Sequence, residues 1–155
     1  MKRIFVTLAA LALLTAGSSQ AQNWFGLRSG FPLGVTVHYG IANALSNGFD
    51  LRISGKVVAR GSITSVGLGL DAMSEVVNRS PFSVYIGAGP AFEFGSGSFL
   101  LDVHGLVGGE FRFTDLGLPA LGIFVEGTLG ANLELTSGSA RIPTFGAALG
   151  FNFRL

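Results

Sequence analysis

The stretch LDVHGLVGGEFRF, Leu101–Phe113, alternates between two kinds of side chain. Every second residue, counted from Leu101, is apolar or glycine, whereas the residues between them are mostly polar, charged or glycine. Successive side chains of a β-strand point to opposite faces, so this period of two predicts a strand with one apolar and one polar face. The pattern recurs in residues 123–135 and 145–155, and helical periodicity is nearly absent elsewhere.

Gly, Ser, Asn, Asp and Pro residues divide the chain into eight segments of this kind. We expect strands at residues 23–30, 33–41, 49–58, 62–72, 82–94, 98–113, 120–135 and 142–155. Segments of about ten residues suit tilted strands that cross a bilayer, and an even number places both termini at one end of a barrel. Most connections are short; within the longer one at 72–81, we expect residues 71–77 to form one or two helical turns.

The first 21 residues have the composition of a cleaved signal peptide. Lys2 and Arg3 precede the apolar run Ile4–Ala16, and small residues then lead to Ala21. This order of charge, apolar run and small residues is typical of a secretory signal cleaved after Ala21. We therefore expect residues 1–21 to be removed and residues 22–155 to form a single domain. The chain has no cysteine, which excludes a lipid anchor.

The composition points to a membrane protein without a transmembrane helix. Charged residues make up 12% of the chain, about half the share typical of soluble domains. No apolar run after residue 21 reaches the length of a membrane-spanning helix, so strands with one face toward lipid fit better. Without Lys2 and Arg3, the ten basic residues become eight against nine acidic ones. This balance gives no electrostatic basis for nucleic-acid binding.

Alternation alone does not say which face points inward. A soluble exported barrel, lipocalin-like, would enclose an apolar lumen (the barrel interior) and bind an apolar ligand there. That arrangement requires a charged outer wall, and the chain has few charges. The polar face is rich in small residues, which fit the narrow interior of an eight-stranded barrel. We therefore favour an eight-stranded antiparallel up-and-down transmembrane β-barrel, all-β, with the apolar face outward and aromatic rings, Trp24 among them, near the strand ends.

The polar face then predicts a network of charges within the lumen. Buried charges are costly unless they are paired, so we expect opposite charges to neutralise one another and close the interior to solutes. Between neighbouring strands we expect Arg112 to pair with Glu126, and Arg154 with Glu134 or Asn132. The predicted network comprises Arg28, Arg52, Lys56, Glu93, Asp102, His104, Glu110, Arg112, Glu126, Glu134 and Arg154, with Asp50 and Asp71 on the same face.

The last ten residues, GAALGFNFRL, place Leu149, Phe151, Phe153 and Leu155 at alternate positions. They are similar to the final strand of bacterial outer-membrane barrels, and the chain as a whole resembles the small OmpA/OmpX-like class. The resemblance implies a location in the outer membrane of a diderm bacterium, contact with outer-membrane lipid, and insertion by the barrel assembly machinery. The chain departs from that class in ending on Leu155 where Phe is usual, and in having short connections where its members have long loops.

Some barrels of this kind are lipid A hydrolases, in which a serine follows the catalytic histidine by two positions. Gly40 and Leu106 stand at those positions after His38 and His104, so we expect no enzyme. His104 and Asp102 share a face, but ion pairing within the lumen explains both. We therefore expect no metal and no cofactor. The expected role is structural, in envelope integrity, or one of interaction; the alternatives are a narrow channel for small solutes and the soluble lipocalin-like barrel. The oligomeric state is left open.

Overall fold

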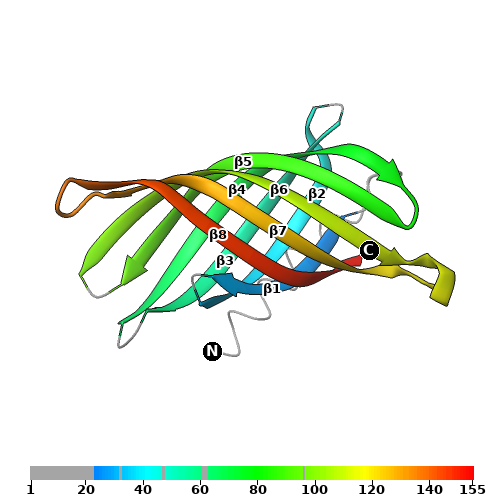
Figure 1. Ribbon diagram of the computed structural model, residues 1–155, viewed down its shortest axis with the longest axis horizontal. Coiled ribbons are helices and arrows are strands. Elements are labelled where there is room, and N and C mark those ends of the chain that lie inside the picture. Colours follow the sequence, from blue (N-terminus) through cyan, green and yellow to red (C-terminus); the bar gives the residue numbers. More distant parts are fainter. Residues whose placement is uncertain (1–22, 32, 47, 61–62, 96) are drawn as a thin grey trace.

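The computed structural model describes residues 23–31, 33–46, 48–60, 63–95 and 97–155, which form eight antiparallel strands (Figure 1). Each strand pairs with the next along the chain, and β8 pairs with β1 to close the barrel. The predicted fold class is confirmed; the predicted signal peptide lies outside the described residues. The elements are β1 (Trp24–Phe31), β2 (Gly34–Ser46), β3 (Phe49–Arg60), β4 (Ile63–Arg79), β5 (Phe82–Gly95), β6 (Ser98–Phe113), the 3-10 turn η1 (Thr114–Leu116), β7 (Leu118–Glu134) and β8 (Ser139–Arg154).

The prediction of helical turns at residues 71–77 is wrong, because this segment continues β4. Asp71 and Met73 are buried in the lumen, whereas Val76 and Val77 are exposed on the wall. The segment hydrogen-bonds to β5 as a strand, with a bulge between Glu75 and Val77. A bulge inserts an extra residue without ending the strand, which is why the alternation looked broken there. No helix among the described residues is long and apolar enough to cross a membrane.

The connections are tighter than expected, and they define two ends of the barrel. Both chain termini of the barrel, and the turns after β2, β4 and β6, lie at what we call the terminal end. The turns after β1, β3, β5 and β7 lie at the far end. Gly97 and Gly138 occupy two far-end turns with φ of 78° and 71°, a left-handed conformation that glycine adopts without steric cost.

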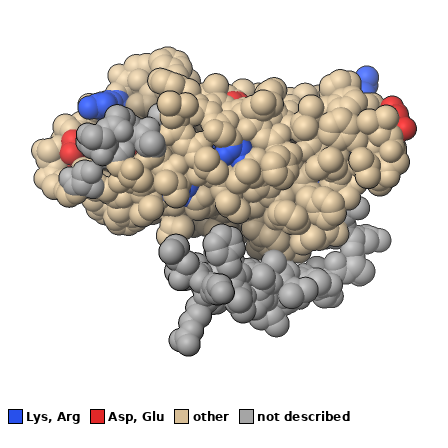
Figure 2. Space-filling view, turned by 90° about the horizontal axis from the view of Figure 1, so that it is seen from below, with Lys and Arg blue, Asp and Glu red and all other residues tan. Residues whose placement is uncertain are grey.

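The outer wall is apolar and the lumen is polar. On β5, Val84, Ile86 and Phe94 are exposed, whereas Ser83 and Glu93 are buried. In the space-filling view the visible face is mostly uncharged; charged atoms lie near the two ends, with a few small patches between them (Figure 2). The apolar face thus points outward as predicted, and an apolar lumen within a charged wall, the lipocalin-like arrangement, is wrong for this chain.

Two groups of phenylalanine rings flank the apolar wall. At the terminal end, the ring centroids of Phe25 and Phe153 lie 5.4 Å apart, and those of Phe82 and Phe111 lie 5.0 Å apart. At the far end, Phe99 stacks on Phe94 at 4.6 Å and on Phe92 at 5.8 Å. The ten steps from Phe82 to Phe92 rise ~33 Å along a strand, or roughly 25 Å in height at a tilt of about 40°, as in outer-membrane barrels.

Trp24 does not belong to either group, contrary to the sequence-based expectation. Its side chain is 6% exposed and faces the lumen, where it lies over Gly40. A Cβ added at Gly40 would lie 2.0 Å from the Trp24 ring, so only glycine leaves room for it. The guanidinium of Arg154 lies 5.8 Å from the ring centroid on the lumen side. Trp24 therefore helps to fill the terminal end of the barrel.

Candidate functional site

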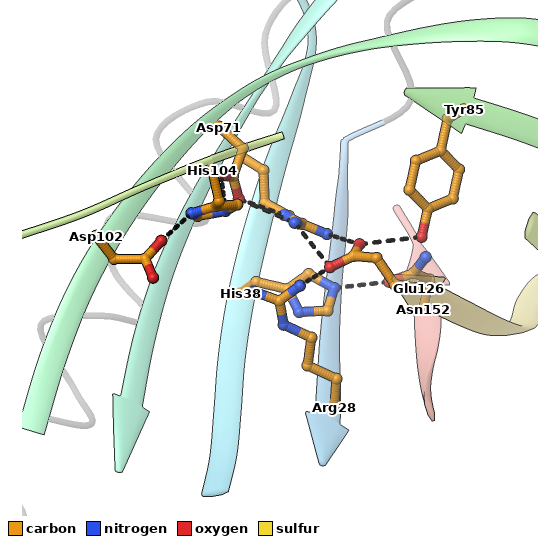
Figure 3. Close-up of polar contacts among 9 residues, drawn as sticks. Arg28, His38, Asp71, Tyr85, Asp102, His104, Glu126 and Asn152 are labelled. Atoms are coloured by element: carbon orange, nitrogen blue, oxygen red, sulfur yellow. Dashed lines mark hydrogen bonds and ion pairs between the residues drawn. The ribbon is translucent and has the colours of Figure 1, made fainter. Parts of the chain in front are cut away.

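The centre of the lumen is an ion-pair network around Glu126 of β7 (Figure 3). Arg52 of β3 donates from Nη1 to Glu126 Oε2 at 2.6 Å, and Arg28 of β1 donates to Glu126 Oε1. The Tyr85 hydroxyl of β5 donates to Oε2 at 3.2 Å. One carboxylate therefore accepts hydrogen bonds from three other strands. We call these four residues, together with Asp71, the central network.

Asp71 and His104 extend the central network toward β6. Arg52 Nε donates to Asp71 Oδ2 at 2.9 Å, and these two residues lie directly opposite each other on β3 and β4. On the other side, Asp71 Oδ1 lies 3.1 Å from His104 Nε2. His104 Nδ1 in turn lies 2.5 Å from Asp102. The chain of contacts thus runs around the lumen from Asp102 to Glu126.

A second group of polar contacts lies nearer the terminal end. His38 pairs with Asn152 at 2.7 Å, and Asn152 donates to Glu110 at 3.2 Å. Glu110 also accepts a hydrogen bond from Arg154 at 3.1 Å. Arg112 donates to Glu75 at 2.7 Å. Toward the far end, Lys56 and Glu93 form a separate pair, with Nζ and Oε2 3.1 Å apart.

The predicted pairs are wrong. Arg112 contacts Glu75 and Glu110 and not Glu126, while Arg154 contacts Glu110 and Glu75. Glu134 lies apart, near the far-end turn, where it accepts a hydrogen bond from Ser139 at 3.0 Å. Asp50 also lies apart and accepts a hydrogen bond from the amide of Asn43 at 2.8 Å. The other predicted network residues lie in the lumen contacts given above.

The partners differ from the prediction because several pairs join strands that are not neighbours. Tyr85, Gly108 and Glu126 lie in register on β5, β6 and β7, and the hydroxyl reaches Glu126 across Gly108. A Cβ at Gly108 would lie 2.3 Å from the Tyr85 ring. The absent side chain is therefore what allows this contact. We call such a position a glycine gap.

Two further pairs have the same geometry. Gly67 lies in register between Lys56 and Glu93, and a Cβ there would lie 2.7 Å from the Lys56 side chain. His38 and Asn152 likewise flank Gly26, where a Cβ would lie 2.5 Å from both side chains. Lumen glycines thus direct polar side chains to partners two strands away.

The predicted network leaves out four residues that line the lumen, although alternation places Phe124 and Asn152 on the polar face. Tyr85, Asn152 and Glu75 take part in the hydrogen bonds above, and Phe124, 2% exposed, packs its ring edge-on to His38 with centroids 5.7 Å apart. Glu75 falls within the segment 71–77 for which the sequence predicts helical turns, although its position two and four residues after Met73 and Asp71 places it on the same face of a strand. Among the described residues, no three His, Cys, Asp or Glu side chains are grouped so as to hold a metal ion.

The lumen is not filled along its whole length, and here the expectation of a plugged interior needs correction. The far half contains a cavity of about 610 Å³, and Arg28, His104 and Glu126 line it on the side of the central network. On the terminal side of the central network, a smaller space beside Arg52 and Tyr85 has a volume of about 30 Å³. The charges therefore close the barrel at mid-height and leave its far half hollow.

Solved structures of outer-membrane barrels resemble this chain in fold. Neisserial surface protein A superposes with a TM-score of 0.60 at 12% identity, covering 87% of this chain and 94% of that one. The N-terminal β-barrel domain of Pseudomonas aeruginosa OprF gives 0.55 at 16%, covering 87% and 96%. A de novo designed transmembrane β-barrel gives 0.50 at 16%, covering 89% and 98%. No protein-family model and no curated protein matches the sequence. The fold is thus that of the small eight-stranded outer-membrane barrels.

Proposed function

We propose that this chain is an outer-membrane β-barrel protein with a structural or interaction role in the cell envelope, and that it does not conduct solutes. The observation that carries the proposal is the contact of Arg52 with Glu126, which crosses the lumen between two buried side chains. Because these side chains are paired, moving them aside would leave buried charges without partners, which is costly.

The surroundings of the central network support the same conclusion. Arg52 of β3, Tyr85 of β5, and Phe124 and Glu126 of β7 meet in this layer, and each is at most 5% exposed. The far-half cavity ends at one side of this layer and the small terminal-side space begins at the other. A channel would require one continuous wet path, so a solute pathway is not favoured.

A location in the bilayer follows from the exposed wall. Val107, Val125 and Leu149 are 54%, 60% and 61% exposed, and a wall of such side chains is stable where hydrocarbon replaces water. Phe151 and Phe153 continue this outer face along β8 and pair with Leu27 and Phe25 of β1. We propose that Leu149, Phe151, Phe153 and Leu155 are the signal read by the barrel assembly machinery.

The absence of catalysis is part of the proposal. The imidazole of His38 is hydrogen-bonded to Asn152, and that of His104 contacts two carboxylates. Neither contact includes a serine hydroxyl that a histidine could activate. Both rings are better explained as members of the lumen network.

Two measurements test this function. Cell fractionation should place the chain in detergent-extracted outer membranes with heat-modifiable gel mobility; recovery in the soluble periplasmic fraction would contradict it. In planar bilayers the wild-type barrel should be silent, whereas R52A/E126A, which removes both sides of the central contact, should open measurable conductance. Conductance by the wild type would instead favour the channel. A silent double variant would show that the barrier lies elsewhere.

A further inference from the structure

The far-half cavity is not confined to the lumen. On β3 it is lined by alternate residues, Ser54, Lys56 and Val58, as expected for a space on one face of a sheet. On β1 and β8, however, it is lined by the consecutive residues 28–31 and 144–148. Consecutive side chains point to opposite faces of a strand. The cavity therefore passes between the end of β1 and the adjoining edge of β8, and it reaches the outer face of the barrel.

The pairing register explains this lateral gap. The last pair between β1 and β8 is Phe31 with Ala147, whereas β8 begins at Ser139. Within the described residues, the far part of β8 has no partner on its β1 side, and Figure 1 shows the β7–β8 hairpin extending well beyond β1. Pro143 lies in this part of β8, and proline in a sheet is found at edges and bulges. We define the lateral gap by Phe31, Leu33, Phe145 and Ala147.

The two sides of the gap differ in chemistry. Outside, Phe31, Leu33 and Phe145 are 71%, 73% and 67% exposed, which suits contact with acyl chains. Inside, the cavity is lined by the charged residues Arg28, Lys56, Asp102, Glu126 and Arg141, by His104, which contacts Asp102, by several hydroxyl side chains and by the amide of Asn132. A ligand that fits both sides has a hydrocarbon part outside and a polar part within.

The charges indicate the sign of that polar part. Arg28 is paired with Glu126 and Lys56 with Glu93. Arg141 also lines the cavity, and it forms no ion pair with any described residue. A guanidinium binds phosphate or carboxylate through two parallel hydrogen bonds. Among the described residues that line the cavity, Arg141 is thus the cation without an acidic partner, and it is available for an anionic group.

We propose that the lateral gap admits the anionic head group of a membrane lipid into the far-half cavity, where Arg141 binds it. The acyl chains stay in the bilayer against Phe31, Leu33 and Phe145. A cavity of about 610 Å³ has the volume of roughly 20 waters at ~30 Å³ each, ample for a phosphate head group. This inference rests on the proposed location in a bilayer.

Binding is tested with the purified full chain, folded in an uncharged detergent and checked by heat-modifiable mobility. Native mass spectrometry is used to count bound short-chain phosphatidic acid, with phosphatidylcholine of the same chains and inorganic phosphate as comparisons. We expect one phosphatidic acid per barrel and at least tenfold weaker binding of the other two. R141E should weaken phosphatidic acid binding at least tenfold, whereas R79E, which alters an exposed arginine at the opposite end, should change it less than twofold.

The position of the head group is tested with cysteine chemistry, since the chain has no native cysteine. In vesicles that contain a lipid with a maleimide on its head group, T128C in the cavity should be labelled. S83C, in the terminal half of the lumen, should not be. Absent or unselective lipid binding, equal binding of inorganic phosphate, equal effects of R141E and R79E, or no labelling of T128C would each overturn the proposal. Since the binding arm uses detergent, a failure to reach the membrane in cells is a separate result that contradicts only the proposed function.

Discussion

Arg52 and Glu126 lie 74 positions apart in the sequence, yet Arg52 Nη1 is 2.6 Å from Glu126 Oε2 in the middle of the barrel. Strands β3 and β7 are separated by three strands in either direction around the wall. The contact therefore crosses the lumen directly, and it joins opposite sides of the barrel through two side chains.

The first prediction concerns the loss of Glu126. E126L would leave Arg28 and Arg52 in the lumen with only Asp71 to balance them, and removing one partner of a buried pair costs about 3–5 kcal/mol. We expect the free energy of unfolding, measured by denaturant titration in lipid vesicles, to fall by about that amount. E134L is the matched control, since Glu134 is partly exposed and bonded to Ser139; it should cost less than about 1 kcal/mol. Equal losses would mean that the central network adds no particular stability.

The second prediction concerns the glycine gap at Gly108. In G108A the added methyl group would overlap the Tyr85 ring and push the hydroxyl away from Glu126. Overpacking of this kind costs about 1–3 kcal/mol. We expect that loss in the same unfolding titration. G127A, on the next strand with nothing within 4 Å of the new Cβ, should change stability by less than about 0.5 kcal/mol. If G108A were as stable as the wild type, the Tyr85 side chain would be able to adopt another conformation without loss of stability.

The third prediction tests which residues are paired. Arg154 and Glu110 are in contact, whereas Arg112 and Glu126 are not. In double-mutant cycles with alanine, we expect a coupling energy of about 0.5–3 kcal/mol for the first pair, as is usual for residues in contact. The cycle for Arg112 and Glu126 should give a coupling within about 0.5 kcal/mol of zero. A larger coupling energy for Arg112 and Glu126 than for Arg154 and Glu110 would instead support the pairing between neighbouring strands that the sequence predicts.

The strands themselves are predicted from the sequence to different degrees. The period of two in residues 101–113 was sufficient for a strand, because lipid on one side and a polar lumen on the other require it. The bounds of β6 agree with the prediction, since turn residues precede it and Phe113 ends the alternation. In β4 the same reasoning failed at Glu75, where a bulge shifts the pattern by one residue.

The sequence predicts less of the candidate site than of the fold. Alternation alone predicts that Glu126 faces the lumen, but its contact with Tyr85 depends on the register, which places Gly108 between them. The far-half cavity depends on β1 ending at Phe31 while β8 extends to Ser139. Neither relation is local in the chain. Glycines on the polar face were the available signal, because a missing side chain inside a narrow barrel marks a place that another residue occupies.

The fourth prediction tests the orientation of the wall. V107K would place a charge at mid-height on the lipid side, which costs about 2–4 kcal/mol in a transmembrane barrel. L118K, equally exposed but beside the terminal-end turn, should cost at most about 1 kcal/mol. Unfolding titrations in vesicles would measure both. If the two lysines were tolerated equally, water and not hydrocarbon would be in contact with Val107.

The distance between the two groups of phenylalanine rings determines which bilayer thickness matches the apolar wall of the barrel. An apolar height of roughly 25 Å is a few ångströms less than the hydrocarbon thickness of an average bilayer. Such hydrophobic mismatch costs a fraction of a kcal/mol for each ångström, since the lipids beside the protein must compress. The chain should therefore insert more readily into membranes of short-chain lipids and accumulate in the thinner regions of a mixed bilayer.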